Sequence, residues 1–193
     1  MATLLLARHG ETDWNRAQRF QGHADPPLND VGRAQARALA DALVGESVSG
    51  VYTSDLRRAR ETAEIVARRL GLRVWALPAL REVDVGEFTG LTLEEIDTRW
   101  PEARSRAETR GYGWQHGETF EQMRGRVVAA LQEIAALHAG DVVLVVGHGG
   151  TIRAALAHAD GVDLVVHRRL VGPASNCAVY RLGAEAGVLK RLD

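Results

Sequence analysis

The feature that most constrains the fold is an alternation of short apolar runs with longer segments whose apolar residues recur every three or four positions. Residues 3–7, 51–53 and 141–146 have the length and aliphatic content of buried strands. Strands separated by amphipathic helices are typical of parallel sheets. The sequence therefore predicts an α/β fold, a three-layer sandwich with helices on both faces of a mostly parallel central sheet.

The positions of the helices follow from stripes and caps. The clearest stripe steps by 3, 4, 3 and 4 residues and consists of Leu56, Ala59, Ala63, Val66 and Leu70. Candidate N-caps, whose side chains accept hydrogen bonds from a first helical turn, are Asn29, Ser54, Thr92 (with Glu95) and Thr119 (with Gln122). After Asn29, the expected buried face consists of Val31, Ala34, Ala38 and Ala42. Residues 176–182 and 188–192 are predicted as final strands.

Length and composition narrow the class of protein. A chain of 193 residues predicts a single domain, residues 1–193, and we expect a specificity insertion at about 91–117, which is polar and poorly patterned from 103 onward. The formal net charge of -1 argues against a nucleic-acid or anionic-membrane surface. No apolar run approaches the roughly 20 residues of a membrane helix. The start of the chain predicts no secretory signal, and the lone Cys177 fits a reducing compartment, so a cytoplasmic protein is expected.

Basic side chains follow three of the predicted strands at the point where each strand ends. Arg8 and His9 follow the first strand, Arg58 lies shortly after the second, and His148 follows the Val-rich strand. Ligands of parallel sheets bind beyond the carboxyl ends of the strands, where helix starts also offer free backbone N–H groups. These two histidines and two arginines are therefore predicted to converge on one anion, a phosphate or a carboxylate.

Other interpretations of the same residues stay open. Each histidine, taken alone, could be a structural hydrogen-bonding group, and an arginine in a first helical turn is usually a surface residue. The two histidines could also be metal ligands, although the neighbouring acidic residues follow no recognised ligand spacing. The conjunction at three successive strand ends is what favours an anion site.

Residues 6–15 (LARHGETDWN) resemble the signature of the histidine phosphatase superfamily, the phosphoglycerate mutase-like proteins. The resemblance continues in order through residues 21–28 (QGHADPPL), 54–59 (SDLRRA) with Thr62, 80–82 (LRE) with Gly86 and Gly90, 117–119 (GET) and 147–150 (GHGG). Order and spacing match over nearly the whole chain. The resemblance implies a phosphoglycerate mutase-like fold.

The resemblance also implies how a phosphoryl group is bound. His9 would be the nucleophile, with one ring nitrogen facing the substrate and the proton of the other held by a backbone carbonyl. Arg8, Arg58 and His148 would surround the phosphoryl oxygens, over which charge spreads during transfer. Further binding contacts would come from Asn15, from the backbone N–H of Gly149 and, at the edge of the pocket, from Gln21.

Glu82 would be the general acid that protonates the leaving oxygen and then the base that activates water. Two alternatives remain for this position: a surface carboxylate paired with Arg81 or Arg16, and a replacement of its role by Asp84. The resemblance implies no metal and no cofactor.

The implied function is a metal-independent phosphatase that acts on a small phosphorylated metabolite through a phosphohistidine. One alternative is a cofactor-dependent phosphoglycerate mutase, for which Arg104, Arg106 and Arg110 could supply extra cationic contacts. A second is a catalytically inactive regulatory domain that binds a phosphorylated ligand. Two positions in the insertion, Trp114 and His116, are open candidates for the pocket wall. An apolar final strand at a sheet edge could pair with a second subunit and form a homodimer.

Overall fold

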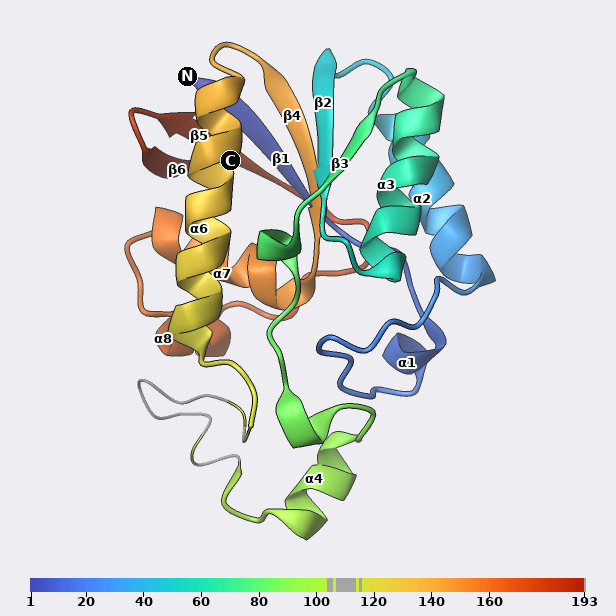
Figure 1. Cartoon of the computed structure of the whole chain (residues 1–193), viewed down its shortest axis with the longest axis vertical. Helices are drawn as coiled ribbons and strands as arrows, with labels where there is room; N and C mark the ends of the chain where they lie inside the picture. The colour runs from blue at the N-terminus through green and yellow to red at the C-terminus, as the bar shows by residue number, and fades with distance from the viewer. Residues whose placement is uncertain (104–105, 107–113, 115, 193) are drawn as a thin grey trace.

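A six-stranded sheet with the strand order β3-β2-β4-β1-β5-β6 forms the centre of the molecule (Figure 1). The computed structural model describes residues 1–103, 106, 114 and 116–192. The strands are β1 (Ala2–Arg8), β2 (Val48–Thr53), β3 (Val74–Ala76), β4 (Val142–Gly147), β5 (Val179–Glu185) and β6 (Val188–Leu192). Strands β1 to β4 run parallel to one another, whereas β5 runs antiparallel to β1 and forms a hairpin with β6. The predicted, mostly parallel sheet is confirmed.

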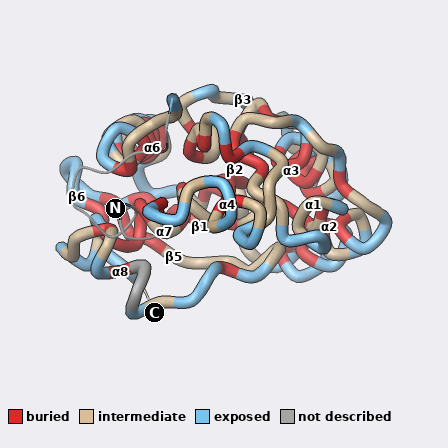
Figure 2. Tube along the Cα trace, turned by 90° about the horizontal axis from the view of Figure 1, so that it is seen from below, coloured by how far each residue is buried: buried red, intermediate tan, exposed pale blue. Residues whose placement is uncertain are grey.

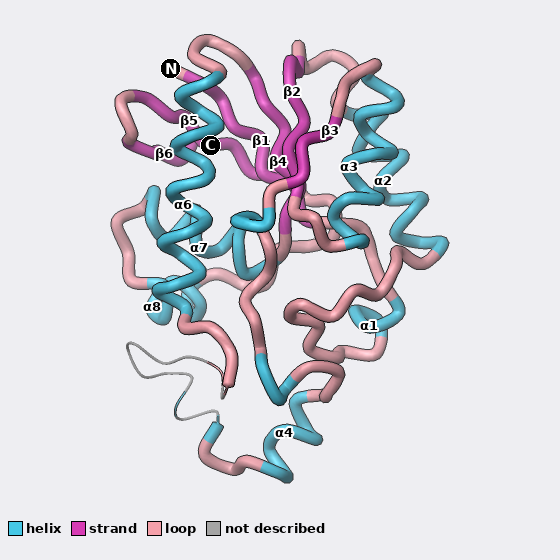
Figure 3. Tube along the Cα trace, viewed as in Figure 1, coloured by secondary structure: helices cyan, strands magenta, loops and turns pink. Residues whose placement is uncertain are grey.

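Helices cover both faces of the sheet (Figures 1 and 3). One face packs against α2 (Asp30–Ala42) and α3 (Arg57–Leu70), and the other against α6 (Phe120–Leu137) and α7 (Gly149–Ala159). The remaining helices are α1 (Asp13–Arg16), α4 (Leu93–Arg99), α8 (Leu164–Leu170) and two 3-10 turns, η1 (Pro78–Leu80) and η2 (Gly86–Phe88). Successive residues of a strand point to opposite faces. In β1, Leu4 and Leu6 therefore join the core beneath α6, while Leu5 and Ala7 join the core beneath α3.

Burial follows these layers, since the buried segments lie along the sheet and the inner faces of the helices (Figure 2). The capping boxes predicted at Thr92 and Thr119 are present, and Asn29 caps α2. None of the helices in the described part of the chain is both long and apolar enough to cross a bilayer. The predicted insertion at 91–117 begins near α4, and its residues 104–105, 107–113 and 115, with Arg104 and Arg110, lie outside the described residues. The single-domain assignment stays a prediction.

Two local predictions were wrong. Helix α2 buries Gly32, Ala36, Leu39 and Ala40, whereas the expected face of Val31, Ala34, Ala38 and Ala42 is exposed. Two features set the orientation of this helix. Leu39 is larger than the alanines of the expected face, and Gly32 packs directly against the backbone of Glu11. Ser54 is not the cap of α3: its Oγ accepts a hydrogen bond from the N–H of Leu56, which is itself the N-cap residue.

The register of the parallel strands places the three predicted strand ends together. Arg8 lies opposite Gly147, and Thr53 lies opposite Val146. The N–H of His9 continues the ladder by donating to the carbonyl of Gly147 over 3.0 Å. The residues that follow these strands therefore leave the sheet at one edge, as the sequence predicted.

The chain after β1 is held in place by contact between two glycines. The N–H of Gly10 donates to the hydroxyl of Thr62 over 3.0 Å. A side chain on Gly10 would collide with the carbonyl of Gly32, and a side chain on Gly32 would collide with the backbone of Glu11. The absence of side chains at both positions lets α2 pack directly against the turn that carries His9.

We expect Gly32→Ala to destabilise the protein by about 1–3 kcal/mol, because its new methyl group meets backbone that cannot move without shifting the turn after β1. Urea unfolding measures this change. The matched control is Gly125→Ala in α6, where an added methyl group meets nothing and should stabilise the helix by about 0.5–1 kcal/mol. Equal effects of the two substitutions would contradict the close contact.

Candidate active site

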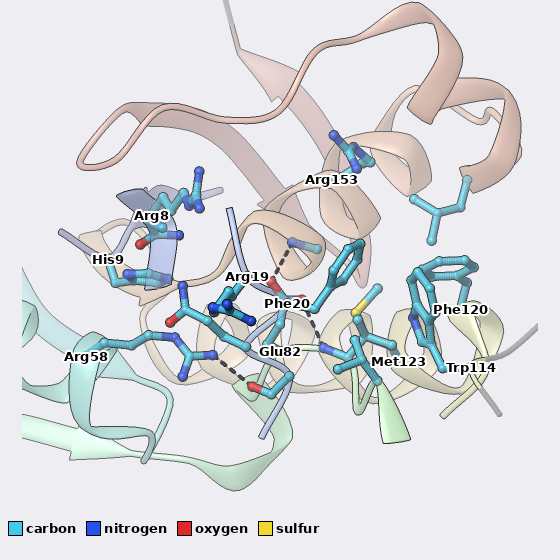
Figure 4. A pocket seen from close by; sticks show the side chains of 17 residues that line it. Arg8, His9, Arg19, Phe20, Arg58, Glu82, Trp114, Phe120, Met123 and Arg153 are labelled. Carbon is cyan, nitrogen blue, oxygen red and sulfur yellow. Dashed lines mark hydrogen bonds between the residues drawn. The ribbon is translucent and has the colours of Figure 1, made fainter. Parts of the chain in front are cut away.

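A cavity of about 200 Å³ opens at the carboxyl edge of the sheet (Figure 4). Segments far apart in the sequence meet there: the end of β1, the chain after α1, the start of α3, the loop before η2, and α6, α7 and α8. Six of the predicted site residues line this cavity, namely Arg8, His9, Asn15, Gln21, Arg58 and Glu82. His148 lies against the ring of His9 without lining the cavity, and Gly149 does not line it either.

The His9 side chain is 97% buried and held in one tautomer, because its Nδ1 lies 2.7 Å from the carbonyl oxygen of Gly10. A carbonyl only accepts, so Nδ1 carries the proton and Nε2 keeps its lone pair. The backbone carbonyl of His9 accepts from Nδ2 of Asn176 over 2.8 Å, which fixes the main chain as well. Burial, together with the positive charges of Arg58 and Arg8, holds the pKa of His9 well below its usual value. His9 is therefore neutral near pH 7.

Arg58 is the largest fully buried side chain among the described residues. Its two terminal nitrogens donate to the carbonyls of Ala24 (2.7 Å) and Gly22 (2.9 Å), while its Nε has no partner within the described ranges. Burial lowers the pKa of Arg58 to about 10, which still leaves it charged at neutral pH. Two carbonyl contacts thus hold a cation beside His9 without neutralising it.

Arg8 is held in a similar way. It donates through one terminal nitrogen to the carbonyl of Ala174 over 2.6 Å, and its buried Nε has no partner in the described structure. Burial lowers its pKa, and the nearby charge of Glu82 opposes that shift. Two guanidinium groups with free N–H donors therefore flank His9. Because unpaired buried donors cost free energy, their arrangement favours an anionic ligand.

His148 is fully buried, and its ring centroid lies 5.2 Å from that of His9. Neither of its ring nitrogens has a hydrogen-bond partner among the described residues. Burial, followed by the charge of Arg58, lowers the pKa of His148 well below its usual value. Without an anion nearby, His148 is a neutral N–H donor and adds no positive charge.

Glu82 lies in the loop before η2 and lines the same cavity as His9, and its carboxylate contacts the first turn of α7. Its Oε2 accepts from the N–H of Gly150 over 3.0 Å, and its Oε1 accepts from the N–H of Val83 over 2.9 Å (Figure 4). A helix N-terminus favours a negative charge. Any side chain on Gly150 would collide with this carboxylate. The alternative partners are engaged elsewhere, because Arg81 pairs with Asp55 and Arg16 pairs with Asp13.

Arg126, on α6, fixes the backbone that carries Glu82, a role that the sequence reasoning missed. It donates to the carbonyls of Ala79 (2.9 Å), Arg81 (2.6 Å) and Glu82 (2.9 Å). The same guanidinium forms a two-pronged ion pair with Glu118, with both N–O distances at 2.7 Å. Only the position of Glu118 in a recognised motif signalled this network in the sequence.

The two predicted amide side chains, Asn15 and Gln21, differ in the atom that each presents to the cavity. Asn15 forms a capping box with Thr12, and its Oδ1 accepts from the Thr12 N–H over 3.1 Å. Its amide nitrogen is therefore the group left to donate into the cavity. Gln21 has a buried Oε1 to which no described group donates a hydrogen bond. An oxygen repels phosphoryl oxygens, so Gln21 would contribute only with its amide turned to present Nε2.

The outer wall of the cavity is apolar and consists of Phe20, Val83, Val85, Trp114, Phe120, Met123 and Leu164. Trp114 packs edge-to-face on Phe20 and Phe88, so the first open candidate of the insertion does belong to the pocket. His116 is exposed and pairs with Glu87, away from the cavity. Arg106 is also exposed, and it pairs with Glu102.

Within the described ranges, no group of three or more His, Cys, Asp or Glu side chains is arranged to hold a metal ion. Histidine and arginine donors make up the polar end of the cavity instead. The chemistry of that end is the binding of an anion beside an unprotonated imidazole nitrogen.

Comparison with known proteins agrees with the family resemblance seen in the sequence motifs. The family described as "Histidine phosphatase superfamily (branch 1)" matches residues 4–191. A metal-independent phosphoserine phosphatase of Arabidopsis thaliana is 41% identical over 156 residues, which cover 78% of this chain and 66% of the relative. A probable phosphoglycerate mutase of Photorhabdus laumondii is 36% identical over 94% of this chain and 85% of its own length.

A solved structure of a mycobacterial glucosyl-3-phosphoglycerate phosphatase superposes with a TM-score of 0.88 at 31% identity, covering 97% of this chain and 95% of that one. The motifs, the fold and the family match agree along almost the entire sequence. The chain therefore belongs to the histidine phosphatase superfamily, branch 1, and is a hydrolase of that family.

Proposed function

We propose that this protein is a metal-independent phosphatase that hydrolyses a small phosphorylated metabolite through a phosphohistidine on His9. One observation carries the proposal: the Gly10 carbonyl, 2.7 Å from Nδ1, leaves Nε2 of His9 unprotonated beside the buried Arg58 and the partly buried Arg8. A neutral imidazole nitrogen beside fixed cations is suited to attack a phosphoryl group and is poorly suited to bind a cation.

The phosphoryl group binds with its oxygens toward Arg8 and Arg58, whose buried Nε–H groups have no hydrogen-bond partner among the described residues. His148 donates a ring N–H, and Asn15 and the backbone N–H of Gly149 supply neutral donors. Gln21 is a weaker contact at the edge of the pocket. Phosphoryl transfer depends mainly on such positioned donors, because charge spreads over the oxygens in the transition state. With these donors supplied by the chain, the reaction requires no metal ion.

In the first half-reaction, Nε2 of His9 attacks phosphorus and the bond between phosphorus and the ester oxygen breaks. The carboxylic acid form of Glu82 gives its proton to that oxygen, so the substrate leaves as an alcohol. In the second half, the Glu82 carboxylate takes a proton from water as the water oxygen attacks phosphorus. The phosphorus–nitrogen bond then breaks, its electron pair returns to Nε2, and inorganic phosphate is released.

The relatives support this class of reaction. Their names include a metal-independent phosphoserine phosphatase and a glucosyl-3-phosphoglycerate phosphatase. The cavity of about 200 Å³ is of a size that suits a small metabolite.

The alternative enzyme is a phosphoglycerate mutase, which returns the phosphoryl group from His9 to the product. The name of the Photorhabdus relative favours it. Of the arginines expected to serve a mutase, Arg106 is exposed and paired with Glu102, which weighs toward hydrolysis. Release of inorganic phosphate, measured against isomerisation of 3-phosphoglycerate, separates the two activities.

We expect His9→Ala to reduce hydrolysis of p-nitrophenyl phosphate at least about 1,000-fold, because the variant lacks the attacking nitrogen. The control is His158→Ala, which removes an exposed histidine of α7. Circular dichroism of both variants checks that they fold. Hydrolysis that survives His9→Ala would overturn the mechanism, and a wild type that binds phosphate without hydrolysing any ester would indicate the inactive binding domain.

Glu82→Gln keeps the shape of the side chain and its contact with Gly150 but cannot exchange the proton. Because p-nitrophenolate leaves without protonation, we expect the variant to form phosphohistidine and to hydrolyse it about 100-fold or more slowly. Rapid-quench labelling should therefore show an acid-labile phosphoprotein that the wild type does not accumulate. Glu133→Gln, on the exposed side of α6, is the control and should behave like the wild type.

The proposed nucleophile must be unprotonated, and the lowered pKa values of His9 and His148 make this requirement measurable as stability. As the pH falls below about 6.5, the unfolded chain binds protons at these positions while the folded chain does not. The contribution of each histidine to the free energy of unfolding is therefore fully present above that pH. Below it, this contribution is lost by up to roughly 1 kcal/mol per pH unit. Urea unfolding between pH 7.5 and 5 measures the free energy of unfolding as a function of pH. This free energy should fall less steeply toward low pH in the double variant His9→Gln/His148→Gln than in the wild type. Equal pH dependence of the two proteins would contradict the lowered pKa values.

A further inference from the structure

Arg153 is a pocket cation that none of the recognised motifs explains. It lies on α7, three residues after Gly150, and lines the same cavity as His9, Arg58 and Glu82. Three residues of helix correspond to about 4.5 Å along its axis. Figure 4 shows Arg153 on the helix wall, apart from His9 and Arg58. Arg153 therefore faces the part of a substrate that lies beyond the phosphoryl group.

The other arginines of the cavity have hydrogen-bond partners, whereas Arg153 has none in the part of the chain that the structure describes. Arg19 donates to the carbonyl of Gly90 and pairs with Glu95 over 3.0 Å, while Arg8 and Arg58 are held by backbone carbonyls. Among the described residues, no hydrogen bond or ion pair engages Arg153, although its side chain is partly buried. A guanidinium withdrawn from water without a partner is costly.

The charges around Arg153 also indicate that it lacks a neutralising partner among the residues described. Burial lowers the pKa of Arg153, and Glu82 is the main charge that opposes this shift. The carboxylate of Glu82 is already bound to two backbone N–H groups. Arg153 in turn lowers the pKa of Arg8, so the two cations repel each other across the cavity. A second anion near Arg153 would relieve this repulsion.

We propose that Arg153 is a specificity-determining residue that binds a carboxylate on the same substrate whose phosphoryl group His9 attacks. A guanidinium fork matches a carboxylate with two parallel hydrogen bonds. One cation suits one negative charge, whereas the phosphoryl end provides two arginines for a more highly charged group. The assignment rests on the proposed phosphatase activity and narrows its substrates to phosphate esters of small hydroxy acids.

The apolar wall fits the carbon skeleton of such a substrate. Phe20, Phe120 and Met123 line the cavity and provide no charged group. An uncharged substituent gains little from Arg153 and leaves it unpaired. A carboxylate placed a few bonds from the phosphate would instead satisfy both ends of the cavity at once.

The test compares two ligands that differ only in this group: 3-phosphoglycerate, with a carboxylate, and glycerol 3-phosphate, with a hydroxymethyl group in its place. We expect the wild type to bind 3-phosphoglycerate at least tenfold more tightly, measured as the inhibition constant against p-nitrophenyl phosphate hydrolysis and by calorimetry. Arg153→Met should abolish most of this ratio, and Arg153→Lys should restore part of it. The control is Arg37→Met, an exposed arginine of α2, which should keep the ratio of the wild type.

Different failures have different meanings. A wild type that hydrolyses the aryl phosphate but binds both ligands equally, or an Arg153→Met variant that weakens both equally, would overturn the carboxylate subsite and leave the phosphatase intact. A wild type that hydrolyses no phosphate ester would refute the proposed function, and calorimetry with the same two ligands would still decide the role of Arg153.

Discussion

The site depends on the register between β1 and β4. Arg8 lies opposite Gly147, so the two histidines that follow these strands leave the sheet next to each other. Strand side chains alternate between faces, and a slip of one residue would turn the inward-facing leucines of β1 toward the wrong core. The apolar cores on both faces of the sheet therefore enforce the register that brings His9 and His148 together. The geometry of the candidate site and the packing of the core therefore depend on the same strand register.

The second constraint is the cost of burying charge. Arg58 is buried almost completely, yet it is held by carbonyls and not by a carboxylate. A buried ion pair at this point would neutralise the charge that a phosphoryl group needs, while carbonyl dipoles retain it. The lowered pKa values of His9, His148 and Arg58 are the consequence of this arrangement. The protein thus accepts lower stability at its polar end in return for a preorganised anion site.

Local signals in the sequence predicted much of the fold and most of the candidate site. Capping boxes at Thr92 and Thr119, the apolar strands and the motifs around His9 and Glu82 act over a few residues and were located correctly. The buried face of α2 was predicted wrongly, because the approach of Gly32 to the turn after β1 is a tertiary contact with no local signature. The roles of Arg126 and Arg153 escaped for the same reason. Arg126 reaches backbone far away in sequence, and Arg153 is recognised only because it lines a cavity and has no partner among the described residues.

The Arg126 network has a consequence for how this enzyme can diversify. Its guanidinium binds the carbonyl of Glu82 and both oxygens of Glu118, and the N–H of Glu118 donates to the carbonyl of Asp84 over 2.9 Å. Both ends of the stretch between these residues are thus fastened to one point on α6. Whatever that stretch gains or loses in length, the backbone of Glu82 keeps this anchor. The stretch can therefore change, in evolution or by loop exchange, without removing the contacts that hold Glu82 and Glu118 to α6.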